Sequence, residues 1–145
     1  MKAKVLNAGP ERTIALIFDK GDEVVSTLQQ FARDHNLTAS RFSAIGALQS
    51  AVLGYFNWES KDYDRIPVDE QVEVLSLNGD IALDGDAPKV HAHAVLGRRD
   101  GSTVGGHVLE ARVRPTLEVI LVESPGYLRK TCDRESGLAL IDIGA

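Results

Sequence analysis

Segments typical of β-strands far outnumber helical ones in this sequence, and this imbalance most restricts the fold. Only residues 23–35 place apolar side chains at helical spacing, with Asp22 or Asp19 as the expected N-cap and Asn36 near the end. The other apolar runs are short, β-branched and bounded by turn residues. Strands and helices do not alternate, which excludes a parallel doubly wound sheet. We predict an α+β fold: a largely antiparallel sheet of seven to nine strands with one main helix packed on it.

Turn residues divide the apolar runs into separate predicted strands. Gln49-Ser50 is expected to break one long run in two, Asn78-Gly79-Asp80 to end another strand, and Asp100-Gly101 to close a hairpin. Pro115 is expected to precede a further strand. The predicted strands are residues 13–18, 41–48, 51–58, 72–77, 89–96, 102–111, 117–122 and 138–143, with 66–68 as a short edge strand and 127–132 as a strand or short helix.

Length and composition predict one folded domain over residues 1–145, because 145 residues is a common size for a single domain. No apolar run approaches the roughly 18 to 20 residues of a membrane span, and no export signal follows Met1. The single cysteine, Cys132, allows no intramolecular disulfide and agrees with a reducing compartment. We therefore expect a cytoplasmic protein without membrane association, with Cys132 nearly buried on a late strand.

The charge balance weighs against nucleic acid as a partner. The chain has 16 Lys and Arg against 21 Asp and Glu, a formal net charge of −5. DNA-binding proteins need a local excess of cations to displace counterions, and the only dense cationic spots are Arg98-Arg99 and the pair Arg112 and Arg114. The charge balance therefore disfavours DNA binding unless oligomerisation builds a basic patch.

Three of the four histidines lie in one predicted hairpin, with His91 and His93 before its turn and His107 after it. His91 and His93 point to the same face of a strand, about 7 Å apart, opposite the small and apolar residues between them. Three imidazoles are the ligand set of an open zinc site, although nickel, copper, cobalt and iron also accept imidazole. The alternative is that the histidines solvate an exposed face or line a subunit interface. His35 is attributed instead to the negative end of the helix dipole.

The register of the hairpin decides whether the three histidines can converge. A two-residue loop at Asp100-Gly101 would pair His107 with Ala94 and send it to the core face. Convergence requires a three-residue loop or a bulge, for which Gly105-Gly106 is the natural place. We predict that His93 and His107 share a face, with such an offset between them and ring nitrogens within about 3 to 4 Å.

Successive short motifs resemble the PPC domain family, the plant and prokaryote conserved domain that accompanies AT-hooks. They are AIGAL at 44–48, LGYF at 53–56, VEVLSLNG at 72–79, HAH at 91–93, GSTVGGHVL at 101–109 and TLEVI at 116–120. The resemblance covers about residues 10–143 and is closest to stand-alone prokaryotic members. It implies an antiparallel sheet with a packed helix, assembly as a homotrimer, and a metal bound at the positions of His91, His93 and His107.

The favoured function is a homotrimeric domain of unassigned biochemical role that binds zinc or another divalent transition metal. One alternative is a zinc-dependent hydrolase, in which the ion activates water. Its base is unassigned: Glu73 and Glu118 are candidates, although an ion pair with Arg112 or Arg114 is the commoner explanation. A second alternative, by analogy with plant proteins, is a DNA-associated regulator. This sequence has no Arg-Gly-Arg-Pro AT-hook segment, so we expect DNA binding to be weak or absent. Neither a catalytic residue nor a small-molecule ligand is identified.

Overall fold

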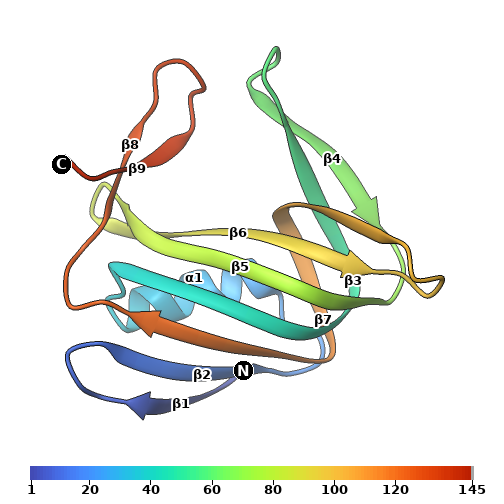
Figure 1. Ribbon diagram of the computed structural model, residues 1–145, viewed down its shortest axis with the longest axis horizontal. Helices are drawn as coiled ribbons and strands as arrows, with labels where there is room; N and C mark the ends of the chain where they lie inside the picture. Colours follow the sequence, from blue (N-terminus) through green and yellow to red (C-terminus); the bar gives the residue numbers. More distant parts are fainter. Residues whose placement is uncertain (145) are drawn as a thin grey trace.

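The computed structural model describes residues 1–144 as a nine-stranded mixed sheet with one helix (Figure 1). The strands are β1 (Lys2–Asn7), β2 (Arg12–Phe18), β3 (Ala39–Asn57), β4 (Asp62–Val68), β5 (Val72–Asp84), β6 (Ala87–Gly97), β7 (Thr103–Glu123), β8 (Arg129–Cys132) and β9 (Ala139–Asp142). The helix is α1 (Val24–Asp34). Neighbouring strands pair antiparallel except β5 and β8, which are parallel. The arrangement fits the predicted α+β class, in a mixed rather than purely antiparallel form.

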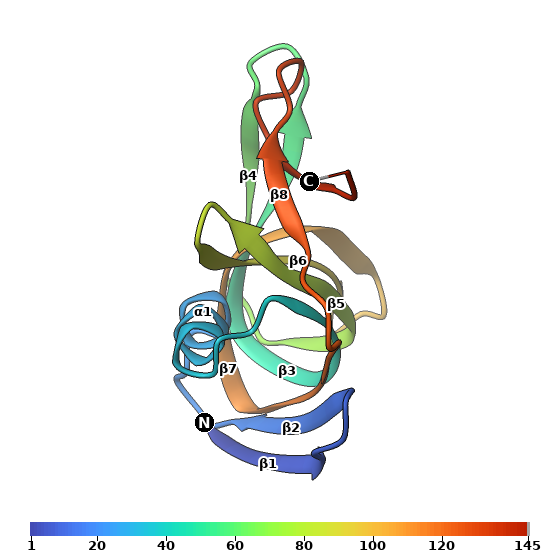
Figure 2. The ribbon, with the colours of Figure 1, turned by 90° about the vertical axis from the view of Figure 1, so that its left-hand side faces the viewer.

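Four of the strands form a closed circuit around the core. β3 pairs with β5 and β7, and β6 pairs with the other edges of both, so the order β7–β3–β5–β6 returns to β7. Figure 2 shows this curvature, with α1 packed along one side. The largest fully buried side chains, inside this circuit and under α1, include Leu16, Phe18, Leu28, Leu48, Leu53, Leu77, Ile81, Leu96, Leu117 and Leu121. Their burial is the main stabilising contribution to the fold.

The helix begins one residue later than predicted, because a different side chain caps it. The carboxylate of Glu23 accepts hydrogen bonds from the backbone N–H of Val25 at 3.3 Å and of Ser26 at 2.6 Å. It also accepts one from Ala111 N–H on β7, at 3.1 Å, which ties the helix start to the sheet. The predicted cap Asp22 instead pairs with the N-terminal amine at 2.9 Å. Asp22 and Asp19 were therefore wrong predictions for the cap.

Three strands continue through residues that were expected to interrupt them. β3 runs through Gln49-Ser50 and β7 through Pro115, while register irregularities between β3 and β7 bend both strands without breaking them. β5 runs through the expected turn at Asn78-Gly79. A Cβ on Gly79 would lie 2.3 Å from the His91 carbonyl oxygen and 2.3 Å from the Phe42 ring. Glycine is needed there for close packing between strands, so the turn prediction was wrong.

Two hairpins, β3–β4 and β8–β9, project from the same end of the molecule (Figures 1 and 2). β4 pairs only with the distal half of β3, and β8 joins β5 through two residue pairs. Cys132 is exposed because it lies in this second projecting hairpin, which contradicts the predicted burial. Among the residues described, no helix is long and apolar enough to cross a membrane.

Candidate metal centre

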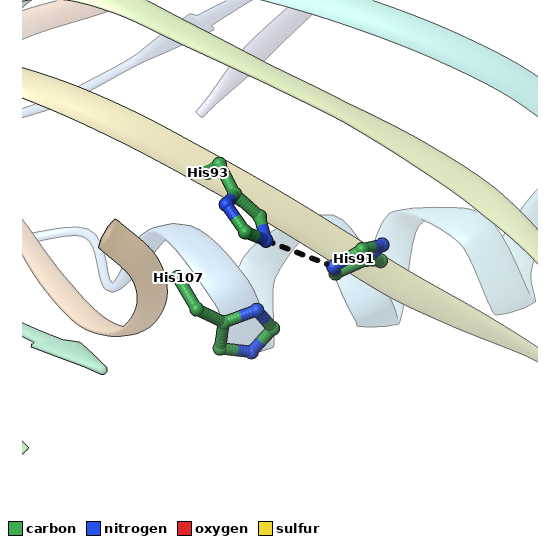
Figure 3. Close-up of side chains that lie close together, drawn as sticks. All are labelled: His91, His93 and His107. Atoms are coloured by element: carbon green, nitrogen blue, oxygen red, sulfur yellow. Dashed lines mark hydrogen bonds between the residues drawn. The ribbon is translucent and has the colours of Figure 1, made fainter. Parts of the chain in front are cut away.

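The hairpin of β6 and β7 brings His91, His93 and His107 together (Figure 3). His93 and His107 are direct partners across the two strands, and His91 precedes His93 by two residues on the same face. One potential ligand atom from each histidine lies within 4.8 Å of the others. Ala92 and Ala94, on the opposite face of β6, are buried in the core. The predicted common face of His93 and His107 is therefore confirmed.

The loop of this hairpin supplies the odd offset that the site requires. Arg98 N–H donates to Ser102 O at 2.8 Å, which leaves Arg99-Asp100-Gly101 as a three-residue loop. Gly101 has φ +84°, a conformation that favours glycine. The alternative position for the offset was wrong, because Gly105 and Gly106 pair regularly with β6. A Cβ on Gly106 would lie 2.8 Å from the Gly54 carbonyl oxygen, so this glycine allows β7 to approach β3.

A carboxylate on the neighbouring strand orients His91. Asp80 is the cross-strand partner of His91, and its Oδ2 lies 3.2 Å from His91 Nδ1. A carboxylate can only accept, so Nδ1 carries the proton and donates, which leaves a lone pair on Nε2. The other oxygen of Asp80, Oδ1, lies 2.8 Å from Lys130 Nζ, whose side chain is 3% exposed. This chain from Lys130 through Asp80 to His91 is the outer support typical of a metal-binding histidine.

Electrostatics keep Asp80 charged despite its surroundings. Burial opposes the charged form, but the hydrogen bonds from His91 and Lys130 outweigh burial and hold the pKa of Asp80 below its ordinary value. Asp80 therefore remains a carboxylate at neutral pH and can fix the tautomer of His91.

The nitrogen positions fit a bound ion. His91 Nε2 and His93 Nε2 are 3.1 Å apart, close to the roughly 3.4 Å that separates two tetrahedral ligands at about 2.1 Å from zinc. His107 Nδ1 is buried and has no hydrogen-bond partner among the described residues, and an orphaned buried nitrogen is costly. A cation held between the rings would satisfy it.

His93 and His107 are held in the protonation state that a metal requires. Burial, and then the neighbouring His91 and His93, lower the pKa of His107 to about 4. Burial also lowers the pKa of His93, with a further contribution from His91 and a partial offset from Asp80. Both rings are therefore neutral near pH 7, and an incoming ion need not displace their protons.

The sequence did not identify three residues that surround the histidines. Tyr63 on β4 stacks on His107, with ring centroids 4.5 Å apart and an interplanar angle of 21°. The other two are Asp80 and Lys130, described above. An acidic residue in the strand beside a His-x-His segment is the one available sequence signal, and the turn predicted at Asn78-Gly79-Asp80 hides it by placing Asp80 outside the strand.

The carboxylates that had been considered as a base do not reach the cluster. Glu73 lies at the far end of β5, opposite Gly97, and Glu118 lines a depression on the sheet with Ile45 and Ile120. Within residues 1–144 neither forms an ion pair with Arg112 or Arg114. The ion-pair prediction for them was therefore wrong, and the glutamates have no role at this site.

Replacing Asp80 by asparagine is expected to weaken zinc binding by about ten- to a hundredfold. The amide has a single acceptor oxygen, which Lys130 takes, and the NH₂ group left beside His91 Nδ1 can only donate, which favours the wrong tautomer of His91. Zinc affinity should be measured by calorimetry against a competing chelator. Asp84→Asn is the matched control, since Asp84 lies on the same strand but pairs with Lys89 at 2.8 Å. Equal zinc affinity in the two variants would contradict the role assigned to Asp80.

Comparison with known proteins gives a consistent family match. A family model of the Plants and Prokaryotes Conserved (PCC) domain matches residues 6–125. The metal-containing protein of Archaeoglobus fulgidus is 32% identical with TM-score 0.82, covering 97% of this chain and 96% of its own. The plant- and prokaryote-conserved (PPC) protein of Pyrococcus horikoshii is 29% identical with TM-score 0.85, covering 97% and 94%. A proposed DNA-binding protein of Ralstonia eutropha JMP134 is 25% identical with TM-score 0.86, covering 97% and 96%. Comparison with curated protein sequences gives no match.

Proposed function

The chain belongs to the Plants and Prokaryotes Conserved domain family, and on this premise we propose that it is a homotrimeric metal-binding protein. His91, His93 and His107 would hold zinc or another divalent transition metal. The main support for this proposal is the convergence of three imidazoles, one of which Asp80 orients. The metal-containing relative from Archaeoglobus fulgidus supports it. When bound, the ion would supply a positive charge and a free coordination position.

Binding is favoured over hydrolysis as the role of the site. A zinc hydrolase needs a base beside the ion, and Asp80 is the carboxylate that lies at the cluster. Both oxygens of Asp80 are engaged, one by His91 and one by Lys130. The proposal is therefore a binding domain, formed by the chain as a single unit. The one cysteine, free and exposed, agrees with a cytoplasmic location.

An exposed apolar surface supports assembly of several copies. Ile45 on β3, Leu75 on β5 and Ile120 on β7 are 62%, 54% and 44% exposed, and they line one depression on the outer face of the sheet. Contiguous apolar side chains on a protein surface are typical of interaction sites. We assign this surface, defined by Ile45, Leu75 and Ile120, to the interface of the homotrimer.

DNA binding is proposed to be weak or absent, although a relative from Ralstonia eutropha is a proposed DNA-binding protein. The chain has a net charge of −5. Arg98, in its densest cationic segment, pairs with Glu70 at 3.0 Å. Both features oppose the release of counterions that drives binding to a duplex. Salt-sensitive retention of the protein on duplex DNA would instead favour the alternative function, a DNA-associated regulator.

Untagged protein is expected to have the mass of three chains. It should contain about one transition-metal ion per chain, because the three imidazoles that form a site come from a single chain. Light scattering and elemental mass spectrometry on the same sample provide the two measurements. Leu75→Lys should reduce the mass toward that of a monomer, whereas Ile141→Lys, at an exposed position outside the surface, should not. A wild-type monomer would refute the trimer, and metal-free protein that takes up no zinc would refute the metal site.

A further inference from the structure

We infer that the pocket beside the three histidines binds a small carboxylate with a short apolar tail, its carboxylate directed to the metal. This inference rests on the proposed metal site and names the class of ligand that the site would accept. The pocket has a volume of about 230 Å³, less than the roughly 300 to 1,000 Å³ of sites for drug-sized ligands. Its occupant must therefore be a small molecule.

The pocket opens directly onto the proposed ion. His91 and His107 form part of its wall, together with the Tyr63 ring that stacks on His107. His93 is the exposed member of the three and does not line the pocket. Two of the three residues that would hold the ion thus line the pocket, so a ligand in the pocket would lie next to the ion.

The charges around the pocket favour an anion once the ion is bound. Lys130 is matched by Asp80 at 2.8 Å, and Lys89 is matched by Asp84 at 2.8 Å. Three neutral imidazoles contribute no negative charge, so the two positive charges of a divalent ion remain uncompensated. Carboxylate oxygen is a normal zinc ligand, and an anionic ligand would offset the ion's charge.

Apolar residues also line the pocket, and this apolar wall determines what the anion carries. Leu138 and Leu140 line it from the β8–β9 hairpin, and Val90 lines it from β6. Leu140 is still 47% exposed, so a hydrocarbon tail that contacts it would remove apolar surface from water. Such a wall selects a carboxylate with a few carbon atoms over an inorganic anion.

Two of the apolar residues that make this selection, Leu138 and Leu140, lie outside the part of the chain that matches the family model. The match ends at residue 125, whereas Lys130, Leu138 and Leu140 follow it in the projecting hairpin. The metal ligands and Val90 thus belong to the matched region, and the C-terminal hairpin supplies Leu138 and Leu140.

The test uses cobalt(II)-loaded full-length protein, because cobalt reports its coordination by visible absorption whereas zinc is spectroscopically silent. Butyrate is expected to change the absorption in a saturable manner, and its uncharged analogue butyramide is expected to leave it unchanged. Leu140→Ala should weaken butyrate binding by about fivefold, because it removes apolar contact with the tail, while leaving acetate binding unchanged. Ile141→Ala is the matched control, since Ile141 is 42% exposed on the same strand and does not line the pocket.

Metal binding and carboxylate binding can fail separately in this experiment. Failure to bind cobalt would remove the proposed metal site, and this inference with it. Cobalt binding with a spectrum that butyrate does not alter at high millimolar concentration would overturn the carboxylate inference and leave the metal site standing. Equal butyrate affinity in wild type and Leu140→Ala would also overturn it, because the pocket would not hold the tail.

Discussion

Replacing His107 by alanine is expected to lower zinc affinity by more than about a hundredfold, beyond the ten- to hundredfold loss typical of an outer-sphere change. His107 offers a buried nitrogen with no hydrogen-bond partner among the described residues. It is also the ligand that β7 would contribute, beside the two histidines of β6. His93→Ala should have a similar effect. Calorimetry against a competing chelator measures both.

His35→Gln is the control for these variants. His35 is the remaining histidine, lies at the end of α1 and packs against Phe31, with ring centroids 4.1 Å apart and the planes tilted by 31°. Zinc at a hundred times its dissociation constant should stabilise the wild type and His35→Gln by about 2.7 kcal/mol. The same zinc concentration should not stabilise His107→Ala. Wild-type affinity in His107→Ala would place the ion elsewhere.

Gly79→Ala is expected to destabilise the protein by about 3 kcal/mol or more, because the added methyl group has no space. Its Cβ would lie 2.3 Å from the His91 carbonyl oxygen, which is backbone and part of the β5–β6 pairing. It would also lie 2.3 Å from the ring of Phe42, which is buried. Urea denaturation of metal-free protein measures the loss.

Gly126→Ala is the matched substitution, because nothing lies within 4 Å of the Cβ it would add. It should leave the free energy of unfolding within about 0.5 kcal/mol of the wild type. If Gly79→Ala unfolded at the wild-type urea concentration, the close approach of β5 and β6 at this residue would be incorrect.

The positions of the three histidines could be predicted in large part from the sequence. Side chains alternate along a strand, which places His91 and His93 on one face. His107 can reach the same face only if the hairpin loop has an odd number of residues. The three-residue loop at Arg99-Asp100-Gly101 satisfies that condition. Asp80 was missed because it is eleven positions from His91 and becomes its neighbour only through strand pairing.

The strand boundaries were less predictable, because tertiary pairing overrides local turn signals. Gln49 is exposed in the middle of β3, so its polarity costs nothing. It lies at a register shift between Leu48 and Ser50, where the pairing with β7 is irregular but the strand continues. Asn78-Gly79 has the composition of a tight turn, but the glycine serves packing against Phe42. β1 was not predicted, since Lys2 and Lys4 give it the character of a solvated N-terminal segment.

The central place of β7 determines when the sheet can form during synthesis. Arg12 pairs with Glu123, and β3 and β6 also need β7 as a partner. At about 5 to 20 residues per second of translation, β2 leaves the ribosome several seconds before its partner. Until then β2 has only β1, and an isolated two-stranded hairpin is marginally stable in water. The apolar side chains of Ile14, Leu16 and Phe18 therefore stay exposed on the nascent chain, where chaperones can bind them, until Glu123 has emerged.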